Sequence, residues 1–572
     1  MVSDERALAI WLAARDDVGL AKTFAGRGVP PTVGWHDFFD AAEGLLDAAS
    51  LDRALSRLPR GDLAALAHRE RHLSAEASDL GLLAADGRPF TTVFARVQAL
   101  TADRPDALEP TSTDGRPPMS AERGAAAAAE RAFTTAGALA DVLLACLHSP
   151  LSRTGTGTIS AADRKRLIES GAVGSPEELE DLMESAAGAG LARALEREWI
   201  VTPDGERWLA SPTAERWTVI AEGFRSALPA GLRTETGGFR DAASWVAAYP
   251  LDPEWPARAA RLRRIAERWG LLDTAGAEPE WTRALRAGGD PDPTALTAHL
   301  PAEIDRLYLQ ADLTAIAPGP LAPHLDLRLR GIARRESRAQ ASTYRFTAES
   351  LGAGMTEGET ASSILEFLGE VSLTGMPQPL AYLIESTATR HGLVRVSADP
   401  ATGRTRVQSP EPGLLETIAV DQALRPLGLI QEDGSLTSRV ARDAVYWSLA
   451  DARYPVVALN PAGDPEPLHR RAAFADGAEG PVPLQAYARL ITLLRGGHST
   501  EGEAAWLGRE LEQAVRARAE ILVVVKMPDG SEREMTLEAS GLGGGRLRGR
   551  DRAADIERTL PISSIVSVRR PS

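Results

Sequence analysis

Cysteine is almost absent from the sequence: among its 572 residues, Cys146 is the only one. A single cysteine excludes a disulfide within the chain and any zinc site built from clustered cysteines. Cys146 stands in the run ALADVLLACLH, whose apolar pattern is typical of a buried helix. We therefore expect a structural thiol there and not a nucleophile.

Long apolar runs are also lacking. No stretch approaches the roughly 20 apolar residues that a helix needs to cross a bilayer. The first residues, MVSDERALAIWLAARDD, carry acids where a signal peptide has a basic region. We expect a cytoplasmic protein, free or nucleoid-associated, with no membrane partner.

Lysine is scarce, since only Lys22, Lys165 and Lys526 occur and the other strongly basic residues are arginines. Together with the abundant alanine and glycine, this pattern indicates a GC-rich genome, so arginine enrichment alone is weak evidence for phosphate recognition. The formal net charge of -15 speaks against a uniformly basic surface that coats nucleic acid. A local basic face is compatible with it.

Catalytic motifs are missing as well. A nucleotide-binding loop of the form GxxxxGK[ST] needs the dipeptide Gly-Lys, which occurs nowhere in the sequence. The run GLGGGR at 541–546 departs from the dinucleotide-binding fingerprint, and HRERH at 68–72 lacks the glutamate position of the zinc motif HExxH. The sequence predicts a protein that is not an enzyme, with no catalytic residue, cofactor, metal or small-molecule substrate.

One short pattern recurs. Residues 80–88 read LGLLAADGR, residues 269–276 read WGLLDTAG, residues 427–434 read LGLIQEDG and residues 199–205 read WIVTPDG. A glycine that ends a helix, an apolar strand and a tight glycine turn before a second strand would form the end of a winged-helix domain. The alternative is an ordinary junction between a helix and a strand.

The best winged-helix candidate is Ala136–Trp217. Ser160 is placed to cap its second helix, and Ser175, followed by Pro176 in the first turn, its third helix. The segment REWIVTPDGERWLA would be the wing. The third helix carries no basic residue and five acids, which are Glu177, Glu178, Glu180, Asp181 and Glu184. DNA phosphates would repel this helix, so we expect a spacer or a protein-docking surface.

The central region carries a family resemblance. The runs YLQADLTAIAPGPL, RRESRAQASTYRFTAESL and ILEFLGEVSLTGMPQPLAYLIESTATRHGLVRV, followed by ALRPLGLI, resemble the helicase-associated proteins of actinobacteria over about residues 303–460. The central domain of that family is similar to the N-terminal region of the nucleotide-excision-repair helicase XPB. The resemblance implies an accessory protein that works beside a DNA helicase, or in DNA binding, without ATPase activity.

The C-terminal segment, from AWLGRELEQAVRARAEILVVV to TLPISSIVSV, resembles a WYL domain. Such a domain is a helix followed by a small Sm-like β-barrel and occurs in bacterial regulators that sense nucleic acid or small ligands. Two features depart from the family: the aromatic strand reads RLRGR here, and Ser564 stands where an arginine is usual. The resemblance therefore implies the barrel scaffold and leaves ligand binding open.

Charges alternate on two neighbouring strands of this expected barrel. If the strands pair antiparallel across the turn GLGGG, acids and arginines share the outer face. The acids are Glu532, Glu534 and Glu538, and the arginines are Arg546, Arg548, Arg550 and Arg552. The pairing would partly neutralise a basic stripe suited to single-stranded DNA.

The segment HLDLRLRGIARRESR, residues 324–338, carries the site prediction. As one helix, it places Leu325, Leu329 and Ile332 on one face and arginines opposite, on one of the most basic surfaces of the chain. Leu327 fits neither face, which favours a helix that begins a turn after Pro323. The candidate nucleic-acid- or partner-binding residues are Arg330, Arg334, Arg335 and Arg338. They would meet phosphates or an acidic helicase surface; the alternative is a solvated face.

These patterns predict a multidomain α+β protein that is mostly helical, with winged-helix-type units, a central α/β helicase-associated domain and a small C-terminal Sm- or SH3-like β-barrel. The expected divisions are an N-terminal helical or winged-helix-like domain (1–108), a linker (109–124), a winged-helix domain (125–225), a helical or winged-helix-like unit (226–300), the helicase-associated XPB N-terminal-like domain (301–460), a linker (461–480) and a helix with the WYL-like barrel (481–572).

The favoured function is that of a non-catalytic, helicase-associated accessory protein in DNA binding or DNA repair. It would act as a scaffold or partner of an XPB-type helicase, with DNA as a further partner. The alternative is a WYL-type transcriptional regulator that uses winged-helix modules.

Overall fold

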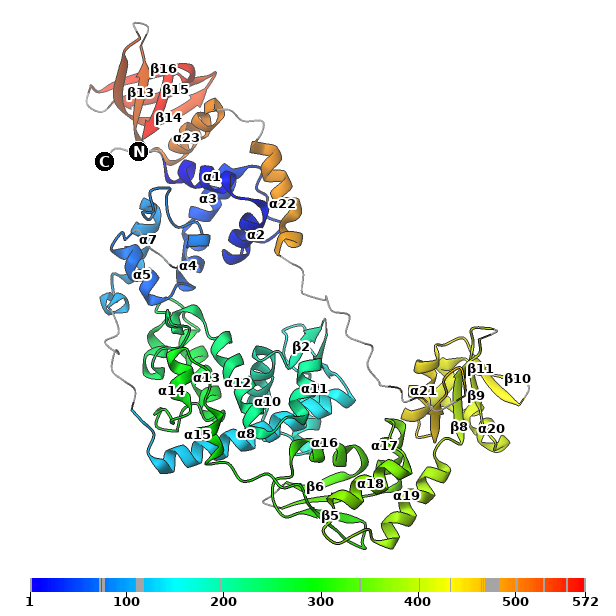
Figure 1. Ribbon diagram of the computed structural model, residues 1–572. Helices are drawn as coiled ribbons and strands as arrows, with labels where there is room; N and C mark the ends of the chain where they lie inside the picture. Colours follow the sequence, from blue (N-terminus) through cyan, green and yellow to red (C-terminus); the bar gives the residue numbers. More distant parts are fainter. Residues whose placement is uncertain are drawn as a thin grey trace.

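The computed structural model confirms a multidomain α+β protein that is mostly helical, with four small sheets among its described residues (Figure 1). It describes the chain except residues 1–2, 71–73, 75–77, 110–117, 196, 339–340, 401, 433, 464–465, 467, 469–482, 499–502, 528–529, 552–553 and 570–572. Five hydrophobic cores define five units, which we call the N-terminal, second, third, fourth and C-terminal units. No helix in the described part is long and apolar enough to span a membrane.

The N-terminal unit is a bundle of short helices. They are α1 (Asp4–Ala14), α2 (Asp17–Gly26), α3 (Phe38–Leu46), α4 (Ala48–Ser56), α5 (Arg60–Ala67), α7 (Thr91–Thr101) and the 3-10 turn η1 (Pro105–Leu108). Ser3, Asp16, Asp37 and Asp47 each accept a hydrogen bond from a backbone N–H in the first turn of the helix that follows. These polar residues before apolar segments explain where the helices begin.

A helix from far along the chain completes this unit. Helix α22 (Pro483–His498) packs against α2, and its buried side chains join the core of the N-terminal unit. They are Tyr487, Leu490, Ile491 and Leu494. The Tyr487 hydroxyl donates to the Val29 carbonyl at 2.6 Å. The helix expected to accompany the C-terminal domain is therefore α23 (Glu503–Ala517), whereas α22 belongs to the N-terminal core.

The second unit has one core that extends from Ala125 to Leu296. Its elements are α8 (Glu122–His148), β1 (Leu151–Ser152), α9 (Ala161–Glu169), α10 (Pro176–Gly188), β2 (Ala192–Leu195), β3 (Glu198–Val201), α11 (Pro203–Ala210), α12 (Thr213–Ala227), η2 (Ala230–Leu232), η3 (Ala242–Ala247), α13 (Trp255–Arg268), α14 (Thr282–Ala287) and α15 (Pro293–Thr297). The segments 125–225 and 226–300, expected as separate units, share this core.

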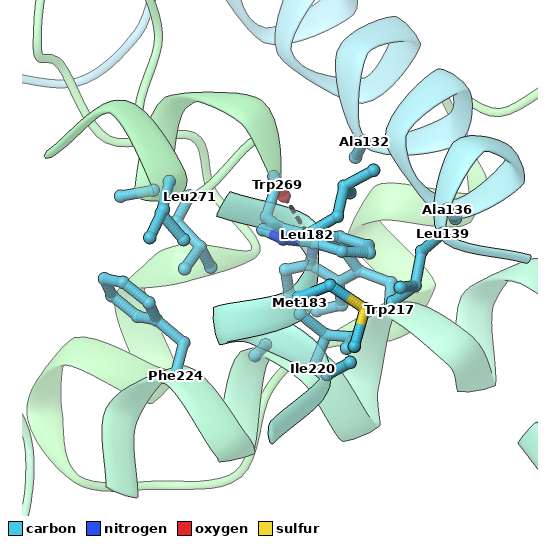
Figure 2. Packing of buried hydrophobic residues seen from close by; sticks show 14 of the residues in the cluster. Ala132, Ala136, Leu139, Leu182, Met183, Trp217, Ile220, Phe224, Trp269 and Leu271 are labelled. Carbon is cyan, nitrogen blue, oxygen red and sulfur yellow. Dashed lines mark hydrogen bonds between the residues drawn. The ribbon is translucent and has the colours of Figure 1, made fainter. Parts of the chain in front are cut away.

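Tryptophans hold the second unit together. Five are at most 1% exposed, namely Trp217, Trp245, Trp255, Trp269 and Trp281. Figure 2 shows Trp217 and Trp269 beside Leu139 of α8 and Leu182 of α10. The Trp217 indole donates to the Trp269 carbonyl at 2.8 Å, so a bulky apolar ring is buried without an unpaired N–H. Cys146 is also buried in this core, as a structural thiol should be.

The recurring glycine pattern has two outcomes. In three copies both glycines have positive φ angles: Gly81 and Gly87, Gly270 and Gly276, Gly428 and Gly434. A strand hairpin follows only in the last copy, where β10 (Ile430–Glu432) pairs with β11 (Ser435–Ser438). In the first two copies the predicted second strand is wrong, because helices α7 and α14 follow the turn.

The predicted wing at 197–210 is also wrong in part. Its Asp204-Gly205 pair lies in α11 and does not form a turn, because Thr202 accepts a hydrogen bond from the Gly205 N–H and Pro203 occupies the first helical turn. The hairpin lies earlier, between β2 and β3, and the sheet order is β1-β3-β2. Glycine is needed at 205 because a Cβ there would lie 2.2 Å from the Leu191 carbonyl oxygen.

One buried acid of the second unit predicts a pH dependence. Glu278 is only 4% exposed, and burial raises its pKa to about 7, although Arg286 acts in the opposite direction. The folded state therefore holds the proton more tightly than the unfolded state, and this contribution to stability is lost as pH rises toward 7. We expect Glu278→Gln to remove that part of the decline. Urea unfolding of both proteins from pH 5 to pH 8 tests this, and parallel curves would contradict it.

The third unit contains β4 (Tyr308–Leu309), β5 (Thr314–Ala317), α16 (Pro323–Ile332), β6 (Arg334–Arg338), β7 (Ser342–Arg345), α17 (Ala348–Thr356), α18 (Ala361–Val371) and α19 (Gln378–Arg390). Its sheet has the order β4-β5-β7-β6, all antiparallel. Thr347 and Thr360 form capping boxes at α17 and α18.

The fourth unit contains β8 (Val394–Ala398), β9 (Thr405–Gln408), α20 (Pro412–Val420), η4 (Gln422–Leu427), β10, β11, α21 (Arg442–Asp451) and β12 (Val456–Ala458). Its sheet has the order β10-β11-β9-β8-β12, and β12 runs parallel to β8. The region 301–460 thus contains two separate hydrophobic cores.

The C-terminal unit is a helix on an open sheet. After α23 come β13 (Glu520–Lys526), β14 (Glu532–Gly543), β15 (Arg546–Asp551), β16 (Ile556–Pro561), η5 (Ile562–Ser564) and β17 (Ile565–Arg569). The order is β16-β15-β14-β13-β17, so β16 and β17 lie at opposite edges. Over the described residues these two strands do not pair, so the sheet stays open. The prediction of a closed barrel is therefore wrong.

The predicted charge ladder in this sheet survives at one pair. Strands β14 and β15 are antiparallel, and Glu538 lies opposite Arg550. Glu532 and Glu534 instead lie opposite residues of β13, because β14 is 12 residues long and its first half pairs only with that strand. A register shift after Ala539 places Gly541 and Gly543 opposite Arg548 and Arg546. Arg552 lies outside the described residues.

Candidate functional site

The segment 324–338 is a helix followed by a strand, not one helix. Helix α16 begins at Pro323, earlier than expected, and ends at Ile332; Ala333 is extended, with φ -142° and ψ 154°. From Arg334 the chain forms β6, which pairs with β7. Leu327 fits poorly into one apolar face because it packs against the core of the second unit, whereas Leu325 packs in the third.

The four candidate arginines therefore lie on two elements. Arg330 is in the last turn of α16, and Arg334, Arg335 and Arg338 are in β6. Arg335 lies opposite Tyr344 of β7. The backbone of Arg338 is described, but its side chain lies outside the described part of the structure.

Two of these arginines meet one carboxylate of the second unit. Asp141 of α8 is 6% exposed, and its Oδ1 accepts from Arg330 Nη1 at 2.7 Å and from Arg335 Nη2 at 2.6 Å. Arg335 Nη2 also lies 2.5 Å from Asp141 Oδ2. The arginines are 19% and 18% exposed. The contact is a half-buried ion-pair cluster that joins the second and third units.

Further charges surround this cluster. Asp326 of α16 lies 3.6 Å from Arg330 and 4.0 Å from Arg335, and it accepts a hydrogen bond from the Tyr344 hydroxyl at 2.5 Å. Burial lowers the pKa of Arg335, but Asp141 and Asp326 outweigh it and hold that pKa above its ordinary value. Arg216 of α12 is also buried here, and burial lowers its pKa to about 10. Arg335 and Arg216 therefore stay charged at neutral pH.

A cavity of about 920 Å³ adjoins the cluster. It lies between α8, the turn after α9 and α11 on one side, and α16 and β6 on the other. Arg330, Arg334 and Arg335 line it, together with four carboxylates, those of Asp141, Glu206, Glu336 and Glu357. The cavity itself is not strongly basic, because acids from both units stand among the arginines, and the binding role of the four arginines stays a prediction.

Sequence reasoning missed Asp141. Its only signal is that it is the single acid in the apolar run ALADVLLACLH. A lone carboxylate inside such a run is buried with the face that carries it, and a buried carboxylate requires a cationic partner. Nothing in the spacing of the chain identifies that partner as Arg330 and Arg335.

The acidic helix α10 has its partner within the same unit. Asp181 is 1% exposed and bonds to three arginines of α13, which are Arg261, Arg264 and Arg268. Glu177 and Glu184 lie 2.7 and 2.8 Å from Arg264 and Arg261. The acidic face of α10 therefore packs on α13 of the same chain, and the spacer or protein-docking role stays a prediction.

Comparison with known proteins finds a family-model match over the region that contains the candidate arginines. Residues 307–433 match the family model described as a helicase conserved C-terminal domain. The match begins just before β4 and extends to the end of β10, so it contains all four candidate arginines and less than a quarter of the 572 residues. No curated protein matches the sequence. The chain carries a helicase C-terminal-like domain, and a helicase-related role follows from it.

Proposed function

We propose that this protein is a non-catalytic accessory of a DNA helicase, acting in the cytoplasm as a scaffold or partner of an XPB-type enzyme in DNA binding or repair. The observation that carries the proposal is a helicase C-terminal-like domain at 307–433 in a sequence that contains no Gly-Lys dipeptide. Without that dipeptide these residues cannot form the loop that holds the phosphates of ATP. The role that remains for such a domain is to bind DNA or a helicase partner.

The second unit supports a docking role. Its order α8-β1-α9-α10-β2-β3, with the sheet order β1-β3-β2, fits the order expected of a winged-helix domain and supports that assignment. In a DNA reader the helix in the position of α10 enters the major groove. Here Glu177, Asp181 and Glu184 of α10 pair with arginines of α13, so the unit is suited to join domains and not to read bases.

The architecture of the C-terminal unit supports its interpretation as a WYL-like module. A helix packs on a five-stranded antiparallel sheet in which β13, the first strand along the chain, pairs with β17, the last along the chain. WYL-type regulators that use winged-helix modules would require a groove-reading helix, which α10 does not provide. That alternative therefore ranks second.

Two assays test the proposal on the purified full-length chain. We expect no ATP hydrolysis above the buffer rate, with or without DNA, because the sequence offers no phosphate loop. We expect the chain to raise the unwinding rate of an XPB-type helicase from the same cell, and the heat-denatured chain to have no effect. ATP turnover by the chain would contradict the non-catalytic assignment, and a tight footprint on one operator sequence would favour the regulator.

A further inference from the structure

The cluster at the contact between the second and third units has the geometry of an anion site. Arg330 and Arg335 come from different elements and converge on the single carboxylate of Asp141, with N–O distances of 2.5–2.7 Å. Paired guanidinium groups that close on one anionic group bind phosphodiesters in the same way, because both anions present two oxygens to the planar N–H fork. The chain's own carboxylate fills this position.

A third arginine stands next to the filled position. Arg334 precedes Arg335 on β6, is exposed and lines the same cavity. In the part of the chain that the structure describes, no carboxylate lies within ion-pair distance of its guanidinium. One arginine of the three is therefore available already, and the other two are held by Asp141.

The closed form excludes a polyanion from the two held arginines. Both are less than one-fifth exposed, and Glu206, Glu336 and Glu357 also face the cavity. Access requires the second and third units to move apart. Besides the cluster, their contact holds a hydrogen bond from the Thr213 N–H to Glu303 at 2.8 Å, and Leu327 packs on the second unit's core. Domains joined by such interfaces are expected to move relative to each other.

We propose that Asp141 occupies the place of a nucleic-acid phosphate, and that parting of the second and third units leaves Arg330 and Arg335, beside Arg334, to bind the phosphate backbone of DNA. This inference rests on the proposed function and deepens it, since it names the ligand and the site of the helicase-like domain. Asp141 acts as an intramolecular competitor that keeps DNA affinity low while the units are together.

The test is Asp141→Asn in the full-length chain. The amide keeps the shape of the side chain but removes the charge that competes with phosphate. We expect binding of a labelled oligonucleotide to tighten by roughly 5- to 150-fold, the usual range for coupling between two sites. The slope of log affinity against log salt should steepen, by roughly 0.7 to 0.9 for each arginine freed to meet a phosphate. Unchanged affinity and slope in a folded variant would overturn the proposal.

The matched control is Glu359→Gln. Glu359 pairs with Arg328, also on α16, at 2.8 Å, but this pair lies within the third unit, and neither residue lines the cavity. Freeing Arg328 should leave oligonucleotide binding unchanged. An equal gain in both variants would mean that any added positive charge tightens binding, and the assignment of the cavity would fall.

Arg334→Ala gives a second, independent arm. This exposed side chain can be truncated without disturbing the cluster, so the variant decides the matter even if Asp141→Asn fails to fold. We expect weaker oligonucleotide binding and a salt slope that is shallower by roughly 0.7 to 0.9. If polyglutamate and not the oligonucleotide responds to these substitutions, the site takes an acidic polypeptide, and the nucleic-acid assignment is overturned.

The two proposals can fail separately. Helicase stimulation without any effect of Asp141→Asn or Arg334→Ala on DNA binding would leave the accessory role standing and remove this site. DNA binding that follows the expected pattern in a chain that hydrolyses ATP would keep the site and remove the accessory role.

Discussion

Replacement of Asp181 by alanine is expected to lower the free energy of unfolding of the second unit by about 3–5 kcal/mol, the cost of breaking a buried ion pair from one side. The side chain is 1% exposed and bonds to Arg261 Nε at 3.2 Å, Arg264 Nε at 2.7 Å and Arg268 Nε at 3.1 Å. Its hydrogen bond raises the pKa of Arg264. Alanine would leave three guanidinium groups of α13 facing one another around an empty position.

Urea unfolding followed by tryptophan fluorescence measures this effect, since five buried tryptophans report on the second unit. The control is Glu184→Ala on the same helix. Glu184 pairs with Arg261 alone and is 45% exposed, so its loss should cost less than about 1 kcal/mol. If the two substitutions cost the same, Asp181 is not the centre of the contact between α10 and α13.

The double substitution Leu490→Ala with Leu494→Ala in α22 is expected to destabilise the N-terminal unit by about 4–10 kcal/mol, since each buried leucine contributes about 2–5 kcal/mol. The two side chains are 4% and 0% exposed and lie in a core whose buried members outside α22 all come from the first hundred residues. Such a loss equals or exceeds the whole stability of many domains. We therefore expect the N-terminal unit to be unfolded in this variant.

Limited proteolysis of the full-length chain measures the outcome, because cleavage within the N-terminal unit should become fast while the second unit stays resistant. Leu493→Ala is the matched control. Leu493 is 46% exposed on the same helix, and its truncation should change stability by no more than about 0.5 kcal/mol. Resistance of the double variant would show that the N-terminal unit folds without α22.

Local signals in the sequence predicted local structure well. Ser175 followed by Pro176 marks the start of α10, and the pattern at 427–434 forms the predicted turn and hairpin. The prediction of one helix over 324–338 was wrong. The helical periodicity of the sequence continues past Ile332, but from Arg334 the chain pairs with β7. A strand that gains a full set of inter-strand hydrogen bonds outcompetes one more turn of helix, and the single sequence does not show that edge.

Charge complementarity between distant helices was visible but could not be paired. Acids at 177, 181 and 184 share one face of a helix, and arginines at 261, 264 and 268 share one face of another. The same reasoning would have allowed either set to meet solvent, DNA or another protein. Only the fold of the second unit, set by its tryptophan core, places the two faces against each other.

The position of α22 has a consequence for how the protein is made. During translation α1 to α7 leave the ribosome well before α22, which follows after roughly 380 residues, on the order of half a minute later. Throughout that interval the faces of α2 and α3 that α22 covers leave apolar side chains exposed to solvent. A nascent chain must therefore keep the N-terminal unit unfinished while three other units form, and chaperones that recognise apolar surface have a binding site on it until α22 is made.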